Sequence, residues 1–280
     1  MAVQFAPKER YTMQDLLEIM RLLRSPEGCP WDREQTHESI RSDFLEETHE
    51  AVEAINLHDT EGLKEELGDV LLQVVFHSRI EEEAGRFDFD DVVDGIAKKL
   101  IVRHPHVFAD ASADSSAQVW QNWDAIKRQT KGGKTQADLL RAVPRSLPAL
   151  MRAAKVQGRA KRVGFDWPDI SGALEALDSE MEELKQAIAS GKAGEIEEEL
   201  GDLLFSVVNV SRFLHTDAEQ ALTLASDKFI RRFTVVEELA AEQGIVMSSA
   251  GLEELDRLWA LAKRRVGPDG PPAAQPADHS

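Results

Sequence analysis

The feature that most constrains this chain is an internal repeat. The segment from Glu66 to Ile80, ELGDVLLQVVFHSRI, returns from Glu199 to Phe213 as ELGDLLFSVVNVSRF, with nine of fifteen positions identical. Three further pairs occur in the same order at offsets between 129 and 136 residues: GCPWD with GFDWP, KKLIVRH with DKFIRRF, and W-x3-K with W-x3-K. Ordered matches of this kind indicate a duplicated unit, so the chain is expected to fold as two copies of one structure.

Both copies are predicted to be helical. Thr12 with Asp15 three residues later is typical of a helix N-cap, and apolar residues follow at helical spacing until Pro26. No sustained alternation of apolar and polar residues indicates strands. We therefore expect an all-α fold of two tandem helical bundles, which divides into a first repeat (residues 11–130), a linker (131–145), a second repeat (146–266) and a disordered tail (267–280).

Composition and charge exclude several classes of function. The chain has 51 acidic and 33 basic residues, and a net charge of -18 repels nucleic acids and anionic membrane surfaces. No apolar run reaches the ~18 residues of a membrane span, and the stretch from Met1 to Met20 lacks the apolar core of a signal peptide. A single cysteine, Cys29, fits a reducing compartment. We expect a cytoplasmic protein with no nucleic-acid or membrane partner.

Each copy also contains four carboxylates at matching positions. The interval between the two acidic pairs of a copy is 19 residues in both, and the residues are Glu47, Glu50, Glu66 and Asp69 in the first copy and Glu180, Glu183, Glu199 and Asp202 in the second. A spacing of three places the members of each pair on one helix face. In a chain this acidic, a single such pair is usually a solvated face.

Two observations favour a metal site over a solvated face. The second pair of each copy leads into a run of apolar residues, which predicts a helix buried on nearly every side. Gly68 and Gly201 lie between the two acids of that pair, and the missing side chain would let a neighbouring helix or a ligand approach. Carboxylates held together in such a place are typical of a hard cation, so we predict Mg2+, with Mn2+ as a possible substitute.

Basic and aromatic residues recur in both copies as well. Lys99 with Arg103 and Lys228 with Arg232 each share a helix face and suit the oxygens of a polyphosphate, although such a pair is equally typical of a solvated face. A tryptophan and a lysine four residues later could hold a nucleotide base and a phosphate, and they are Trp123 with Lys127 and Trp259 with Lys263. A tryptophan at helical spacing is more often part of a core.

These residues resemble the MazG family of nucleoside triphosphate pyrophosphohydrolases, which belongs to the all-α NTP pyrophosphatase superfamily. The resemblance runs from about Thr12 to Arg265 and rests on GCPWD, LEETHE, ELGD, GRFDF and RHPHVF, followed by GFDW, EEELGD, DKFIRRF and W-x3-K. It implies Mg2+-dependent hydrolysis of a nucleoside triphosphate or its deoxy form to the monophosphate and pyrophosphate. It also implies a helical homodimer with a role in cleaning or controlling the nucleotide pool.

The resemblance assigns roles to the paired residues. In tandem members the second repeat is regarded as catalytic, which implies metal ligands at Glu180, Glu183, Glu199 and Asp202, phosphate contacts at Lys228 and Arg232, and a nucleotide site completed by Trp259 and Lys263. The first repeat supplies the matching set Glu47, Glu50, Glu66, Asp69, Lys99, Arg103, Trp123 and Lys127. The second repeat departs from the family's EExxE pattern, because Ser179 stands where the first repeat has Glu46. Which copy works therefore remains open.

Two other functions fit some of the same residues. Glu46-x2-His49 is a motif of carboxylate-bridged di-iron bundles, but such a site needs two of them and the second repeat has Glu182 in place of His49. A nucleotide sensor or helical scaffold that binds without turnover is the non-enzyme alternative. Iron content tests the first of these, and nucleotide binding without product formation would indicate the second.

Overall fold

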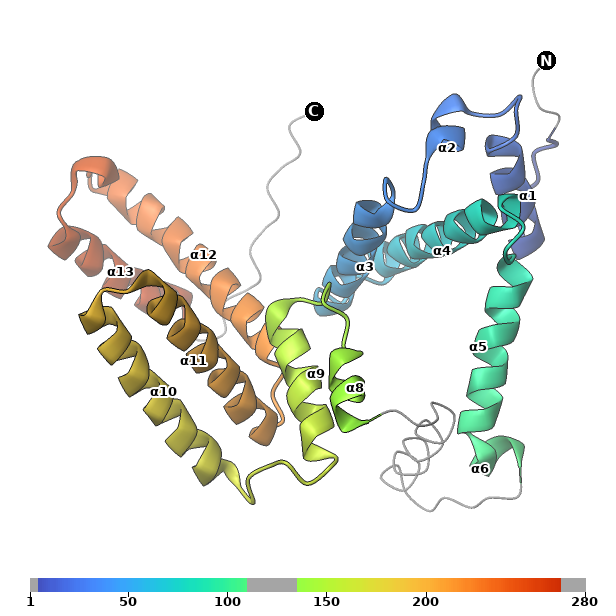
Figure 1. Cartoon of the computed structure of the whole chain (residues 1–280). Helices are drawn as coiled ribbons and strands as arrows, with labels where there is room; N and C mark the ends of the chain where they lie inside the picture. The colour runs from blue at the N-terminus through green and yellow to red at the C-terminus, as the bar shows by residue number, and fades with distance from the viewer. Residues whose placement is uncertain (1–4, 110–134, 268–280) are drawn as a thin grey trace. The chain divides into compact units, whose positions relative to one another are not determined.

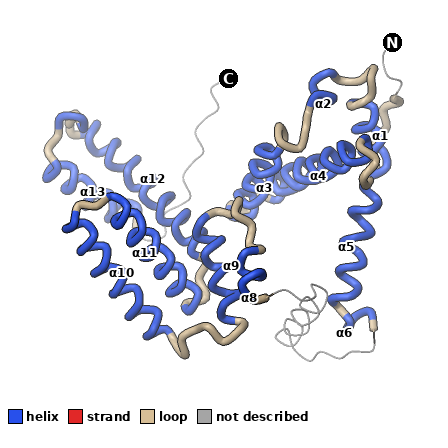
Figure 2. The backbone as a smooth tube through the Cα atoms, in the orientation of Figure 1, coloured by secondary structure: helices blue, strands red, loops and turns tan. Residues whose placement is uncertain are grey.

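The computed structural model describes residues 5–109 and 135–267 of the chain. It divides into two compact units, Met1–Gly132 and Gly133–Ser280. All regular structure in the described ranges is helical, as Figure 2 shows, which confirms the all-α prediction. Within those ranges, every helix is too short or too polar to cross a membrane.

The first unit is built around a helical hairpin. Its helices are α1 (Met13–Leu23), α2 (Pro30–Glu34), α3 (Arg41–Asn56), α4 (Thr60–Glu83), α5 (Phe89–Arg103) and α6 (Pro105–Phe108). α3 packs along α4, and α1 packs on the C-terminal part of α4 (Figure 1). The predicted N-cap of α1 is confirmed, because the Thr12 amide donates to Asp15 Oδ2 at 2.8 Å and the Thr12 hydroxyl accepts from the Asp15 amide. The core contains Met20, Ile40, Val75 and Phe76.

The second unit contains two helical hairpins. Its elements are α8 (Gln136–Arg141), α9 (Ala149–Lys161), α10 (Ile170–Ser190), α11 (Ala193–Phe213), α12 (Ala218–Glu242), a 3-10 turn (Met247–Ser249) and α13 (Leu252–Val266). α10 pairs with α11 and α12 pairs with α13 (Figure 1). Gly191 ends α10 with φ of 70°, a left-handed conformation that glycine adopts without strain. Leu258 and Ala262 of α13 are fully buried against α12.

Part of the predicted linker is helical. We predicted a linker at residues 131–145, but residues 136–141 within it form the helix α8. Thr135 and Asp138 form a capping box that starts this helix, and α8 then packs on α9. Residues 131–134 and the predicted disordered tail beyond Gly267 lie outside the described residues.

The parts of α4 and α11 that follow the second acidic pair of each copy are only half buried in the single chain. We predicted burial on nearly every side, which is wrong for both copies. Leu71 of α4 is 37% exposed, and Leu204 and Phe205 of α11 are 48% and 42% exposed. The physical reason is that α3 and α10 each cover one face of their partner, whereas the opposite apolar face is not covered by described residues. These faces are available to another molecule.

A buried ion pair ties α11 to the segment before α10. Arg212 donates through both terminal nitrogens to the Asp166 carboxylate, at 2.9 and 2.5 Å, and its guanidinium lies 4.5 Å from the Phe213 ring centre. The two charged side chains are only 14% and 13% exposed. The hydrogen bonds from Arg212, more than any other cause, lower the pKa of Asp166.

Replacing Asp166 by Ala is expected to destabilise the second unit by about 2–3 kcal/mol, because it leaves the Arg212 charge without its partner in a nearly buried place. Urea unfolding of this variant measures the loss, and Asp178→Ala on the exposed face of α10 is the matched control. Since the pKa of Asp166 is lowered on folding, its contribution is present above the unfolded value near 3.8 and is lost as pH falls through the folded value. Equal stability of the two variants at neutral pH would contradict this role.

Two histidines form a hydrogen-bonded chain in the first unit. His37 Nδ1 lies 2.7 Å from His77 Nδ1, and His37 Nε2 lies 2.6 Å from the Glu81 carboxylate. Hydrogen bonds from Arg86 and His37 lower the pKa of Glu81 to about 2. Burial and the neighbouring charge of His37 lower the pKa of His77. When both rings are protonated, two N–H donors face each other and the chain breaks.

The first unit is therefore expected to lose stability as pH falls below about 6.5, the ordinary histidine value. A histidine whose pKa is lowered on folding contributes stability above its unfolded pKa and loses it as pH falls toward the folded value. We expect the thermal midpoint to drop between pH 7 and pH 5 by about 2 °C more in the wild type than in His77→Gln. His49→Gln, an exposed site on α3, is the control and should retain the wild-type slope.

Candidate metal centre

Each acidic pair is carried by one helix of a hairpin. Glu47 and Glu50 lie one turn apart on α3, and Glu66 and Asp69 lie one turn apart on α4. The buried residues of α3 are Ala51 and Ala54, whose small side chains let its backbone approach α4. The second unit repeats this arrangement on α10 and α11, where Ala187 occupies the place of Ala54.

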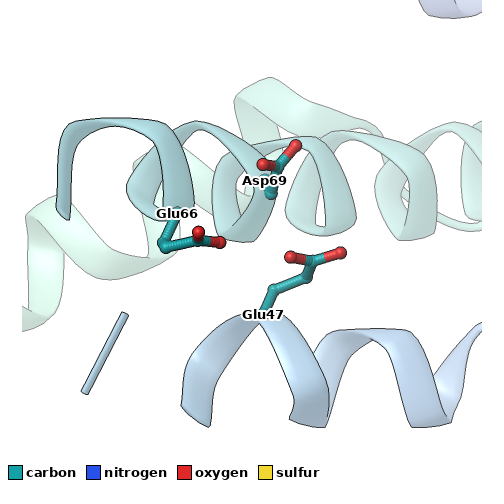
Figure 3. A group of neighbouring side chains, drawn as sticks. All are labelled: Glu47, Glu66 and Asp69. Atoms are coloured by element: carbon teal, nitrogen blue, oxygen red, sulfur yellow. The ribbon is translucent and has the colours of Figure 1, made fainter. Parts of the chain in front are cut away.

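Three carboxylates converge in each unit. In Figure 3, Glu47 points from α3 toward Glu66 and Asp69 on α4. One oxygen from each of these residues lies within 4.8 Å of the other two, and the same holds for Glu180, Glu199 and Asp202. An octahedral Mg2+ ion with ligands at ~2.1 Å separates their oxygens by ~3.0–4.2 Å. Small side-chain movements therefore suffice for either triad to hold such an ion, so the residues fit the predicted metal.

The electrostatics of both triads favour a cation. Burial raises the pKa of Glu66, and the charges of Glu50 and Asp69 raise it further. In the second unit, burial and the charge of Glu183 raise the pKa values of Glu180 and Glu199. The neighbouring charges that raise these two pKa values most are all carboxylates. A divalent cation would offset their repulsion.

The fourth predicted carboxylate of each unit lies near its triad. The charge of Glu50 raises the pKa of Glu66, one of the triad carboxyl groups. Glu183 accepts a hydrogen bond from the Ser179 hydroxyl at 2.8 Å. Sequence reasoning noted Ser179 as a departure from the family pattern but missed this bond, which the i,i+4 spacing could have indicated.

Gly68 and Gly201 do not mark a close approach within the chain. A Cβ atom added at either position would meet no described atom within 4 Å. Of the two approaches expected at these glycines, that of a neighbouring helix is therefore not made by the described part of the chain, and that of a ligand stays a prediction. The acidic pairs meet because α3 packs along α4 and α10 packs along α11.

The basic residues lie on helices other than those that carry the triads. Lys228 and Arg232 lie on α12, which packs mostly on α13 and also on α9 and on α11, the helix of Glu199 and Asp202. The Arg232 Nε atom is buried without a hydrogen-bond partner among the described residues. In the first unit, Lys99 is exposed on α5 and Arg103 is half-buried near the end of that helix.

The tryptophan of the second unit contributes to packing. The Trp259 ring lies 5.1 Å from the Phe229 ring of α12 and packs against the core between α12 and α13. It remains half-buried, and Lys263 one turn later is exposed. Trp123 and Lys127, the predicted counterparts in the first repeat, lie outside the described residues.

Pockets in the first unit do not coincide with its triad. One lies between α1, α4 and the start of α5 and includes Arg21 and Arg79, and the other includes Phe5 and Cys29. In the first pocket, Arg21 pairs with Glu18 and Arg79 pairs with Glu82. The residues of the first triad line neither of these two pockets.

Comparison with known proteins identifies what the chain resembles. The model of the MazG nucleotide pyrophosphohydrolase domain matches residues 35–108 and 170–236, which contain both triads. The chain is 48% identical over 255 residues to the nucleoside triphosphate pyrophosphohydrolase of Escherichia coli (strain K12), covering 89% of this chain and 96% of the relative. It is 47% identical over 250 residues to the nucleoside triphosphate pyrophosphohydrolase/pyrophosphatase MazG of Thermotoga maritima, covering 89% and 95%.

Proposed function

Because this chain belongs to the MazG family of nucleotide pyrophosphohydrolases, we propose that it hydrolyses nucleoside triphosphates at the carboxylates of its second unit. The chain is a hydrolase of the bond between the α- and β-phosphoryl groups, so its products are the monophosphate and pyrophosphate. The observation that carries the site assignment is the convergence of Glu180, Glu199 and Asp202 from two helices.

The second unit is favoured because the second repeat is regarded as catalytic in the tandem members of the family that this chain resembles. Its triad and Glu183 lie on α10 and α11, the basic pair Lys228 and Arg232 on α12, and Trp259 with Lys263 on α13. We assign catalysis to the second unit and leave the first triad as a further cation site.

Mg2+ is the proposed cofactor, with Mn2+ as a substitute. When bound, the ion supplies positive charge that offsets the charge of the triphosphate. Glu180, Glu183, Glu199 and Asp202 would hold it, since their oxygens are the ligand type that hard cations prefer. Water attacks the α-phosphorus, and the bond to the bridging oxygen breaks as pyrophosphate leaves.

The basic residues of α12 are proposed to hold the phosphates. Lys228 is exposed, and the buried Nε atom of Arg232 has no partner among the described residues, so both can donate to an incoming anion. Lys228 and Arg232 lie on α12 and the triad on α10 and α11, so a bound substrate would bridge the two groups. Trp259 and Lys263 would then face the base and the outer phosphates from α13.

We propose a homodimer as the working form. Every residue from Asp91 to Val102 of α5 is exposed in the described part of the chain, including Val93, Ile96 and Leu100. A helix that exposes so many apolar side chains is typical of a surface covered in an assembly. Sedimentation of the purified protein tests this form. Cytoplasmic location and the absence of nucleic-acid partners remain proposals supported by the single Cys29 and the net charge of -18.

Separation of the reaction products tests the proposed function directly. The purified protein is incubated with a panel of ribonucleoside and deoxyribonucleoside triphosphates and Mg2+, and the products are separated by ion exchange. Monophosphate and pyrophosphate in equal amounts are the expected result. Diphosphate with orthophosphate, or tight binding without any product, would contradict it. The panel also ranks the bases and sugars that the site accepts.

A further inference from the structure

The two units differ at the position that precedes the triad glutamate of α3 and α10. The first unit has Glu46 there, and the second has Ser179. The Ser179 hydroxyl donates to Glu183 Oε1 at 2.8 Å across one helical turn. In the first unit, Glu46 stands at the position of this hydroxyl, and the matching glutamate, Glu50, lies near enough to Glu66 of the triad to raise its pKa. The Ser179 hydroxyl therefore gives Glu183 a hydrogen-bond donor that an ionised Glu46 cannot give Glu50.

The difference follows from the chemistry of the two side chains. A serine hydroxyl carries a hydrogen that it can donate, whereas an ionised glutamate only accepts. Glu46 and Glu50 are like charges one turn apart, which disfavours their approach. Ser179 binds one oxygen of Glu183 and leaves the second oxygen free for a cation. Replacing the glutamate by serine also removes one negative charge beside the second triad.

Glu183 lies near two members of the second cluster. Among the neighbouring charges that raise the pKa values of Glu180 and Glu199, that of Glu183 has the largest influence on both. These two residues lie on different helices, α10 and α11. An interaction that restricts Glu183 therefore bears on one ligand from each helix of the cluster.

We propose that Ser179 is a positioning residue, which orients Glu183 toward the second triad and so raises the affinity of that cluster for a divalent cation. The proposal rests on the assignment of the metal site to the second unit. It makes the departure from the EExxE pattern a functional feature of this chain and not an impairment. Ser179 acts only through Glu183 and does not touch the substrate.

Binding of Mn2+ alone, without nucleotide, provides the test. The measurements use full-length protein in which Glu66→Gln and Asp69→Asn disable the first triad, and electron paramagnetic resonance counts free Mn2+. Because the loss of a residue that orients a metal ligand typically costs 10–100-fold in affinity, Ser179→Ala should weaken binding about 10-fold, at the lower end for an exposed side chain. Ser179→Thr keeps the hydroxyl and should restore binding to within about 3-fold.

The matched control is Ser190→Ala. Ser190 is also on α10 and also donates to a glutamate, Glu195, at 3.0 Å, but that glutamate lies outside the triad. Its loss should leave Mn2+ affinity unchanged. Equal affinity in the parent protein and Ser179→Ala overturns the proposal, as does failure of Ser179→Thr to restore binding while circular dichroism shows the folded helix content of the parent.

Kinetics separate this inference from the proposed function. In the otherwise wild-type protein, Ser179→Ala should raise the Mg2+ concentration needed for half-maximal hydrolysis about 10-fold, with kcat recovered at saturating Mg2+. If the wild type hydrolyses nucleoside triphosphates and Ser179→Ala shows no change in metal requirement, only the inference fails. If the wild type shows no hydrolysis, the proposed function fails, and the Mn2+ measurement still decides whether Ser179 orients a cation ligand.

Discussion

Replacement of Glu199 by Gln is expected to lower the rate of nucleoside triphosphate hydrolysis at least about 100-fold, the size of effect seen when a group that stabilises transition-state charge is removed. Glu199 is one of three residues whose oxygens converge in the second unit, and the amide that replaces its carboxylate carries no charge. The variant should fold normally, because removing one of several repelling carboxylates relieves repulsion. Product formation under saturating Mg2+ measures the effect.

Two further variants define what the result means. Glu197→Gln makes the same chemical change on an exposed position of α11 outside the triad and should alter the rate less than about 2-fold. Glu66→Gln makes the same chemical change in the first triad, and it should alter the rate of hydrolysis less than about 3-fold if the second unit is catalytic. A large loss in Glu66→Gln with an active Glu199→Gln would transfer catalysis to the first unit.

Removal of divalent cations by a chelator is expected to lower hydrolysis at least about 100-fold and to lower the thermal midpoint as well. The physical reason for the second effect is repulsion. Burial raises the pKa values of Glu47 and Glu180, and neighbouring carboxylates raise them further, so the ionised forms cost stability when no cation is bound. Excess Mg2+ or Mn2+ should restore both properties, which calorimetry and the product assay measure.

The pH dependence of this effect has a definite sign. A carboxyl group whose pKa is raised on folding binds more protons in the folded state, so the metal-free protein loses stability as pH rises from about 4.5 through the raised values. The stabilisation by Mg2+ should therefore be larger at pH 7 than at pH 5. A chelator that changes neither activity nor the thermal midpoint would contradict the metal assignment. Equal Mg2+ stabilisation at both pH values would contradict the proposed electrostatic cause.

Local patterns predicted the helices and the helix faces that the acidic pairs share. The capping box of Thr12 and the shared faces of Glu47 with Glu50 and of Glu66 with Asp69 depend on residues within one helical turn. Such features need no knowledge of distant contacts. The start of α8 was not predicted, although the capping box of Thr135 and Asp138 is a local signal of the same kind as that of Thr12.

Long-range features were harder to predict. The apolar runs of α4 and α11 indicated full burial, but periodicity cannot reveal whether a face is covered by the same chain or by another molecule. The glycines between the acids similarly indicated a close approach that no described atom makes. The His37, His77 and Glu81 chain joins residues that are far apart in sequence, so spacing gave no sign of it.

The sequence by itself determined that the protein is a duplicated all-α chain with a repeated set of four carboxylates in each copy, because repeats, caps and helical spacing are properties of neighbouring residues. Only the tertiary structure decided which three of the four converge and what holds the fourth. Glu180 and Glu199 are 19 residues apart, and their oxygens come within 4.8 Å only because α10 and α11 pack along each other. The bond from Ser179 to Glu183 likewise depends on side-chain orientation, which a pattern of residue types does not specify.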